Sequence, residues 1–277
     1  MLRCVDGPEV LAYQLDFPSI LTELMTPKAS FALVTGGAQR LGRAIALELA
    51  AQGWSIALHY RSSAAQAQTT AQDIEALGVR CVLLQADLSD ATAVESLFEQ
   101  ATQAGSVRCV VNNASLFEFD QPSTFSPQLF QQHMASNLMA PLLLAKCLHA
   151  HVPEGQQGVV VNLLDQKLHN LNPDFLSYTL SKAGLQTATT LLASQLAPKL
   201  RVVGVAPGLT LISHLQTPEQ FEKTHQISPI GRSSQPEDIA RAVSFLVHSP
   251  AITGTTLLVD GGQHLVPMAR DFSMMTP

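Results

Sequence analysis

A tyrosine and a lysine four residues apart, Tyr178 and Lys182, are the pair in this chain best suited to proton transfer. They lie in LSYTLSKAGLQTATTLLASQLA, whose composition is typical of a helix, and this spacing places both side chains on one helix face. A lysine cation lowers the pKa of a neighbouring phenol and orients it, so that the phenol can deliver a proton. The pair therefore predicts acid–base chemistry, with a chance pair of helix residues as the alternative.

Asp165 lies thirteen residues before Tyr178 and ends the apolar run VVVNLLD. A carboxylate beside the phenol disfavours tyrosinate, so we expect Asp165 to be protonated or to carry protons. This arrangement suits a substrate nitrogen that must gain a proton better than a carbonyl oxygen that must become an alkoxide. Phe117 follows another apolar run and could stack on a planar ring, with core packing as the alternative.

Seven short apolar runs must position these residues, and they alternate with helical segments such as 41–52 and 64–77. The runs are 31–35, 55–60, 80–85, 107–112, 158–164, 200–205 and 256–260. Their apolar residues are continuous rather than alternating, as in parallel strands covered on both faces. We expect a single α/β domain, a Rossmann-type doubly wound parallel sheet of about seven strands with helices on both faces.

The 277 residues accommodate one such domain at 29–265, flanked by two shorter segments. Residues 1–28 are predicted to be an N-terminal extension, and Met25 is an alternative start of the protein. Residues 266–277 form a C-terminal tail that could reach a neighbouring subunit or pack on its own domain. The polar segment 209–234 leaves the end of the sixth run, where we expect a substrate lid rather than an ordinary surface loop.

Composition excludes several classes of protein. The net charge of −6 provides no basic stripe for nucleic-acid phosphates, and no apolar run reaches the roughly 18 residues of a membrane span. The acidic N-terminus is unlike a signal or transit peptide. The four cysteines lie far apart, and neither they nor the histidines have metal-ligand spacing. We therefore expect a cytoplasmic protein with reduced thiols, no metal site, and no nucleic-acid or membrane partner.

A glycine-rich turn, TGGAQRLG, connects the first strand to the first helix at 35–42. Glycines there let the backbone turn sharply and approach a pyrophosphate at the helix N-terminus. The second run is not followed by the acidic residue that would bind the ribose 2′-hydroxyl of NAD. Instead His59, Arg61 and Ser62 offer a cation and hydroxyl donors suited to a 2′-phosphate. The pattern predicts NADPH as the cofactor.

Over about residues 30–265 these motifs resemble the short-chain dehydrogenase/reductase family. TGGAQRLG resembles its TGxxxGxG cofactor turn, and Tyr178 with Lys182 resembles its YxxxK signature. Two positions depart from the general pattern, because Arg40 replaces a glycine and Asp165 replaces the serine that hydrogen-bonds a substrate carbonyl. Both replacements, together with the segment HYRSS, are similar to the pteridine reductases.

The resemblance implies roles for residues at matching positions. Asn137 would hold a water of the proton relay beside Tyr178, Lys182 and Asp165, with a satisfied buried amide as the alternative. The cofactor would be bound by Gly36, Arg40, Leu41, Gly42, His59, Tyr60, Arg61, Ser62, Asp87, Leu88, Asn113, Ala114, Tyr178, Lys182, Pro207 and Gly208. The substrate would be bound by Arg40, Ser115, Phe117, Asp165, Tyr178 and Thr210. A homotetramer, assembled through helices that include the one bearing Tyr178, is also implied.

Three functions stay open on the sequence. The resemblance favours NADPH-dependent reduction of a dihydropterin, dihydromonapterin or dihydrofolate to its tetrahydro form. The second candidate is a short-chain carbonyl or 3-oxoacyl reductase, against which Asp165 counts. The third is a non-catalytic NADP(H)-binding sensor, against which the intact Tyr178, Lys182 and Asn137 count.

Overall fold

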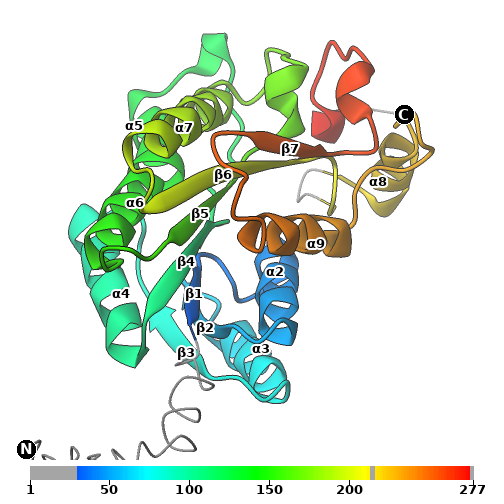
Figure 1. The fold of residues 1–277 in the computed structure, drawn as a ribbon. Coiled ribbons are helices and arrows are strands. Elements are labelled where there is room, and N and C mark those ends of the chain that lie inside the picture. Colours follow the sequence, from blue (N-terminus) through cyan, green and yellow to red (C-terminus); the bar gives the residue numbers. More distant parts are fainter. Residues whose placement is uncertain (1–29, 213–215, 275–277) are drawn as a thin grey trace, which may run out of the picture.

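A seven-stranded parallel sheet forms the centre of the protein, in the order β3-β2-β1-β4-β5-β6-β7 (Figure 1). The computed structural model describes residues 30–212 and 216–274. The strands are β1 (Phe31–Val34), β2 (Ser55–Tyr60), β3 (Cys81–Gln85), β4 (Val107–Asn112), β5 (Gly158–Leu163), β6 (Leu200–Pro207) and β7 (Thr256–Val259). The expected fold class is confirmed, and each strand lies within two residues of its predicted bounds.

Helices cover both faces of the sheet. One face carries α2 (Arg40–Ala51), α3 (Ala64–Glu75) and α9 (Pro236–Val247). The other carries α4 (Ala91–Ala104), α5 (Pro127–Met134), a π-helical turn η2 (Ala135–Met139), α6 (Ala140–His151) and α7 (Leu176–Gln195). The chain runs outward from β1 through β2 to β3 and then crosses back to β4, so a topological switch point lies between β1 and β4.

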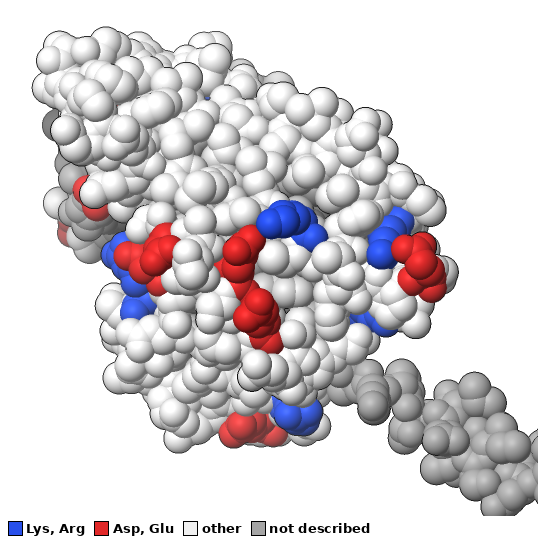
Figure 2. Space-filling model, turned by 90° about the vertical axis from the view of Figure 1, so that its left-hand side faces the viewer, with Lys and Arg blue, Asp and Glu red and all other residues white. Residues whose placement is uncertain are grey.

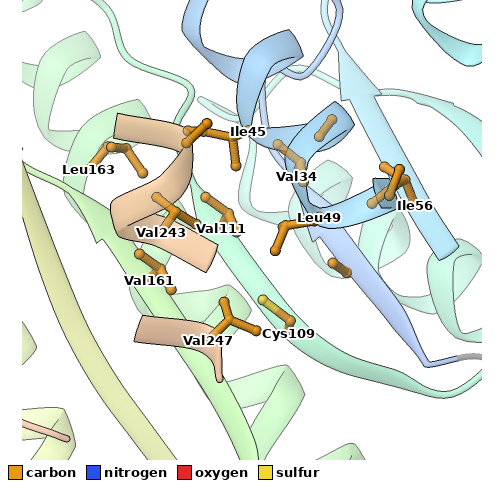
Figure 3. Packing of buried hydrophobic residues seen from close by; sticks show 14 of the residues in the cluster. Val34, Ile45, Leu49, Ile56, Cys109, Val111, Val161, Leu163, Val243 and Val247 are labelled. Carbon is orange, nitrogen blue, oxygen red and sulfur yellow. The ribbon is translucent and has the colours of Figure 1, made fainter. Parts of the chain in front are cut away.

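The core between the sheet, α2 and α9 explains why the strands are apolar on both faces. Figure 3 shows Ile45 and Leu49 of α2 and Val243 of α9 pointing toward Val111 and Val161 of the central strands. All five side chains are fully buried. A matching cluster under α4 and α6 buries the opposite face. With both faces packed, the strands are fixed in register and their carboxyl ends share one edge.

The segments outside the regular alternation meet near that edge. The predicted lid, 209–234, contains the short helix α8 (Pro218–His225), with 213–215 outside the described residues. The domain ends in a 3₁₀ turn, η4 (Gln263–Leu265). The described part of the tail, residues 266–274, contains a second 3₁₀ turn, η5 (Phe272–Met274), and packs on its own domain. The predicted extension 1–28 and the alternative start Met25 lie outside the described residues. In the described ranges, no helix is long and apolar enough to span a membrane.

Candidate active site

Two cavities open at the carboxyl ends of the strands and share a border. The first has a volume of about 460 Å³ and the second about 280 Å³. Arg40, Leu41, Asn113 and Ser115 line both cavities. In an open parallel sheet, ligands bind at this edge, beside the switch point. The pair of adjoining cavities therefore has the arrangement expected of a cofactor site next to a substrate site.

The first cavity gathers most of the predicted cofactor residues from the ends of four strands. Those lining it are Gly36, Arg40, Leu41, Gly42, His59, Arg61, Ser62, Asp87, Leu88, Asn113 and Ala114. Tyr178, Lys182, Pro207 and Gly208 line the second cavity instead. Tyr60 lines neither, because its ring packs against the core under α2. Gln39, Ser63, Leu116 and Ser136 also line the first cavity, and only their proximity to the motifs could have indicated them.

The glycine-rich turn is held against the end of β4. Asn113 donates its side-chain amide to the carbonyls of Thr35 and Gly36 at 2.8 and 3.2 Å. Gly36 has a φ of +62°, in the left-handed region that favours glycine. A side chain at Gly42 would collide with the Gly36 carbonyl and the Asn113 amide. The turn is therefore packed too closely for any residue but glycine at Gly42, and it leaves the start of α2 open to the first cavity.

Arg40 adopts a backbone conformation that is costly for an arginine. Its φ is +54°, a left-handed conformation that costs about 1–3 kcal/mol for residues other than glycine. Its guanidinium donates to the carbonyl of Ile212 at 2.8 Å, which connects the turn to the segment 209–234. Strain of this kind persists where the surrounding structure imposes it, and it is frequent at ligand sites. Arg40 thus places a cation on the border between the two cavities.

His59 connects three segments and is not available as a phosphate cation. Its Nδ1 accepts the Gly36 backbone N–H at 3.0 Å, and its Nε2 donates to the Ala86 carbonyl at 3.2 Å. Burial lowers the pKa of His59, so the ring is neutral at pH 7. We correct the expectation that His59 contributes directly to a 2′-phosphate site. The exposed side chains of Arg61 and Ser62 remain to contact such a phosphate.

The anchored start of α7 fixes the position of Tyr178 at the second cavity. Asp120, almost fully buried, accepts the Ser177 backbone N–H at 2.9 Å and so satisfies one of the free donors of the first helical turn. The preceding residue, Phe175, has a φ of +56° and turns the chain sharply into the helix. The tyrosine therefore enters the cavity from a rigid helix end.

Tyr178, Asp165 and Lys182 come together at the end of β5, as the sequence predicts. The Tyr178 phenol donates to Asp165 Oδ2 at 2.7 Å. The other carboxylate oxygen, Oδ1, accepts the Lys167 backbone N–H at 2.8 Å. Lys182 Nζ donates to the Leu163 carbonyl at 2.7 Å and lies 5.8 Å from the centre of the Tyr178 ring. All three side chains line the second cavity.

Burial sets the proton affinities of this triad. Burial raises the pKa of Tyr178 well above its ordinary value, and the neighbouring Asp165 carboxylate raises it further. Burial also raises the pKa of Asp165 and lowers the pKa of Lys182 to about 8. The raised pKa of Tyr178 agrees with the expectation that Asp165 disfavours tyrosinate. The expected lowering of this pKa by Lys182 stays a prediction. Tyr178 is thus a neutral phenol that can donate a proton.

Asn137 supports the loop that carries Phe117. Its Oδ1 accepts the Leu116 N–H at 2.8 Å, and its Nδ2 donates to the Leu116 carbonyl at 2.9 Å and to Ser181 Oγ at 3.0 Å. These three contacts match the satisfied buried amide better than the side chain of a water-binding residue. Asn137 lies in the π-helical turn η2, an irregularity that is frequent at functional sites. We therefore describe Asn137 as a positioning residue.

The remaining predicted substrate residues differ in how many contacts their side chains already make within the protein. Phe117 lines the second cavity, stacks on Phe175 with ring centres 4.2 Å apart, and lies edge-to-face against Tyr178 at 4.8 Å. Ser115 is exposed at the border of both cavities. The Thr210 hydroxyl donates to the Gly208 carbonyl at 2.9 Å and contacts Ser234 Oγ at 2.7 Å, so its hydrogen bonds hold the loop after β6.

The second cavity also contains residues that sequence reasoning missed. They are Leu163, Leu164, Gln166, Leu209, Leu211, Phe272 and Ser273. The first five adjoin predicted positions on β5 and in the lid, so proximity could have indicated them. Phe272 and Ser273 belong to the C-terminal tail, and no sequence signal connects them to the site.

Known proteins share this fold and these motifs. A family model described as enoyl-(acyl carrier protein) reductase, one of the short-chain dehydrogenase/reductase models, matches residues 36–264. The chain belongs to the short-chain dehydrogenase/reductase family. It is similar to FolM alternative dihydrofolate reductase 1 from Brucella canis, whose crystal structure is complexed with NADP. The identity is 40% and the TM-score 0.80, covering 86% of this chain and 95% of that chain.

The chain is also similar to ketoreductases. The 3-oxoacyl-(acyl-carrier-protein) reductase FabG of Staphylococcus aureus is 31% identical over 244 residues, 84% of this chain and 98% of that protein. The structure of the angucycline C-6 ketoreductase LanV with bound NADP is 32% identical with a TM-score of 0.78, covering 86% of this chain and 96% of that chain. The family is therefore established, whereas the proteins to which the chain is similar differ in the substrates that their names give.

Proposed function

We propose that this short-chain reductase uses NADPH to reduce a pterin, such as a dihydropterin, dihydromonapterin or dihydrofolate, to its tetrahydro form. The observation that carries the proposal is the 2.7 Å hydrogen bond from the Tyr178 phenol to Asp165, a carboxylate in place of the serine expected from the family pattern. The similarity to the FolM alternative dihydrofolate reductase from Brucella canis supports it.

The first cavity fits NADPH. The close contact of Gly42 with Gly36 leaves the backbone N–H groups at the start of α2 accessible to a pyrophosphate. Arg61 and Ser62 offer a cation and a hydroxyl to a 2′-phosphate, and the adjoining acidic residue, Asp87, is occupied by hydrogen bonds from Ser89. When bound, NADPH supplies the hydride that adds to the carbon of the substrate C=N bond.

The triad supplies the proton that the substrate nitrogen needs. Tyr178 holds its proton because its pKa is raised, so it donates to the nitrogen only as electrons arrive there. Asp165 also has a raised pKa and accepts the hydrogen bond of the phenol, so a protonated Asp165 can return a proton to Tyr178. Lys182 contributes a positive charge beside the ring. For a ketone, whose oxygen must become an alkoxide, an ionised Asp165 beside Tyr178 would be unfavourable, because two neighbouring negative charges repel each other.

The substrate would lie in the second cavity, beside Phe117 and Arg40. An aromatic ring is suited to stacking on a flat heterocycle, and such a contact contributes about 1 kcal/mol. Arg40 provides donors where the two cavities meet. We keep the lid role of 209–234 as part of this proposal, because Arg40 hydrogen-bonds Ile212 in that segment.

The test follows NADPH oxidation with dihydrobiopterin, dihydromonapterin, dihydrofolate and a panel of ketones. We expect turnover of at least one pterin, and a loss of at least tenfold in its kcat/KM for Asp165→Ser. Turnover of ketones alone would contradict the pterin assignment and favour the carbonyl reductase, which the FabG and LanV similarities support. NADPH binding without oxidation by any of these substrates would indicate the sensor.

Assembly and location complete the proposal. An apolar groove of about 310 Å³ crosses α5, η2 and α6 and is lined by Phe130, Gln131, Met134, Ala135, Leu138, Met139 and Leu142. Figure 2, a view of this side, shows an upper part almost free of charged side chains. We infer a homotetramer through this face and α7, measurable by light scattering.

A cytoplasmic location agrees with Cys81, Cys109 and Cys147 being free.

A further inference from the structure

The C-terminal tail supplies part of the wall of the second cavity. Phe272 and Ser273 line the cavity together with Asp165 and Tyr178, about 100 residues earlier in the chain. Phe272 is only 4% exposed, and its carbonyl accepts the side-chain amide of Gln216 at 3.2 Å. An aromatic side chain buried at the wall of a ligand cavity limits what the cavity can hold.

Asp271 fixes this wall with both of its carboxylate oxygens. Oδ1 accepts the backbone N–H and hydroxyl of Ser273 at 3.0 and 2.7 Å, which closes the turn η5. Oδ2 forms an ion pair with Lys167 Nζ at 2.8 Å. Lys167 is 2% exposed, and its ammonium also donates to Asn172 at 2.6 Å. A buried ammonium in this position requires its partner, because an unpaired buried charge is strongly destabilising.

The ion pair leads directly to Asp165, which accepts the hydrogen bond of the Tyr178 phenol. Lys167, whose side chain binds Asp271, donates its backbone N–H to Asp165 Oδ1 at 2.8 Å. A second anchor lies on the other side, where the buried Asp174 accepts from Arg270 Nε and from the Asp271 backbone N–H, both at 2.8 Å. Both anchors therefore connect the tail to the segment 165–175, which carries Asp165 at one end and precedes Tyr178 at the other.

We propose that residues 266–274 form part of the wall of the substrate site. Phe272 limits the size of the substrate, and the Asp271–Lys167 ion pair holds Phe272 and Asp165 in fixed positions. The inference rests on the proposed function only for the identity of the substrate. Phe272 is thus a specificity-determining residue. Asp271 and Lys167 are positioning residues, because they hold Phe272 and Asp165 in place.

The charges around Asp165 make the role of the positioning residues measurable in the pH dependence of activity. Tyr178 and Lys182 face Asp165 from α7, and Asp271 faces it from the tail. The negative charge of Asp271 raises the pKa of Asp165 beyond the larger effect of burial. Removing that charge lowers the pKa of Asp165, so a reductase that needs a protonated Asp165 loses activity at a lower pH.

The first experiment changes the wall in two directions, with Phe272→Ala and Phe272→Trp. Its readout is the ratio of kcat/KM for dihydrofolate to that for dihydrobiopterin, which carries a much smaller substituent. We expect the ratio to rise about three- to tenfold for Phe272→Ala and to fall for Phe272→Trp, with the KM for NADPH unchanged. Phe245→Ala, at an exposed position of α9, is the matched control and should leave the ratio unchanged.

The second experiment tests the ion pair with Asp271→Asn. We expect a lower Tm, and a falling limb of the kcat/KM profile that moves to lower pH. The double variant Lys167→Met with Asp271→Asn removes both charges but keeps a side-chain oxygen that can accept from Ser273. It should recover part of the Tm lost in Asp271→Asn, because the unpaired buried ammonium is removed. Glu95→Gln breaks the exposed pair with Lys146 and is the control, with no expected change in either readout.

The results separate this inference from the proposed function. If the wild type turns over no pterin, the proposed function fails, and the size ratio is then measured with a small and a large ketone that the wild type reduces. With either class of substrate, an unchanged ratio of kcat/KM for the large and the small substrate in both Phe272 variants would overturn the claim that Phe272 limits the size of the substrate. A pH profile that does not move in a folded Asp271→Asn protein would overturn the positioning role.

Discussion

The two adjoining cavities are built from the chain in different ways. The first is lined by residues 36–136, most of them within a few residues of the ends of β1 to β4. The second takes residues from the loop after β4, the end of β5, the start of α7, the loop after β6 and the tail. The first cavity lies around the tightly packed glycine-rich turn, whereas the second combines apolar side chains with the buried ionisable groups of Asp165, Tyr178 and Lys182.

This difference indicates which of the two cavities can accept substitutions without loss of the fold. The first cavity depends on close backbone packing, as at Gly42, so few residues fit there. The second depends on side chains whose proton affinities are set by burial, as at Tyr178 and Asp165. Substitutions in the second half should therefore change the substrate and the pH dependence while cofactor binding is retained.

The largest expected effect is on Tyr178→Phe, which removes the proton donor of the second cavity. We expect kcat for the preferred substrate to fall about 10²- to 10⁴-fold, because positioned acid catalysis contributes this much. The dissociation constant of NADPH, followed by its fluorescence, should stay within threefold of the wild type. Thr190→Ala, an exposed change on the same helix, is the control. Equal losses of turnover and NADPH affinity would contradict the separation of the two halves.

Arg61→Ala tests the first cavity in the same way. We expect the KM for NADPH to rise about ten- to a hundredfold, since hydrogen bonds to a charged group are lost, while the KM for NADH changes little. Steady-state kinetics with both cofactors at saturating substrate measures the two effects. Arg80→Ala, whose guanidinium donates to the Ala104 carbonyl away from the cavity, is the matched control. A parallel rise in both cofactor KM values would remove the phosphate role of Arg61.

Asp165→Asn should increase stability in a pH-dependent way. Burial raises the folded-state pKa of Asp165 above its unfolded value. The stability that this group contributes is therefore present below its ordinary pKa and is lost as pH rises through the folded-state pKa. The amide does not ionise, so its advantage in unfolding free energy should grow with pH by at most about 1.4 kcal/mol per unit. Urea titrations from pH 4 to 8 measure this advantage, and a constant difference would exclude the buried carboxyl as its cause.

The smallest expected effect is on Phe117→Ala. Loss of one stacking contact with a planar substrate should raise its KM by about fivefold, corresponding to roughly 1 kcal/mol. The KM for NADPH should not change, because Phe117 lines only the second cavity. Phe125→Ala, an exposed phenylalanine of the same loop region, is the comparison variant. An unchanged substrate KM would show that Phe117 serves only its stack with Phe175.

Local patterns of the sequence determined the parallel sheet, the glycine-rich turn and the Tyr178–Lys182 pair. Strand and helix periodicity and the conformational freedom of glycine act over a few residues, so they can be recognised without knowing the fold. Asp165 was recognised because it departs from a family pattern at a fixed spacing from Tyr178. These residues specified an acid–base site beside a dinucleotide site.

Only the tertiary structure decided which groups are buried and which distant segments meet. His59 became a neutral connection between Gly36 and Ala86 because the ends of β1, β2 and β3 close around it. The pKa of Tyr178 is raised first by burial and then by Asp165, and no spacing of residues reveals how deeply a side chain is buried. Phe272 lines the second cavity beside an ion pair between two residues that are 104 positions apart, Lys167 and Asp271. Contacts over such distances depend on the closed packing of the whole domain, which no local pattern records.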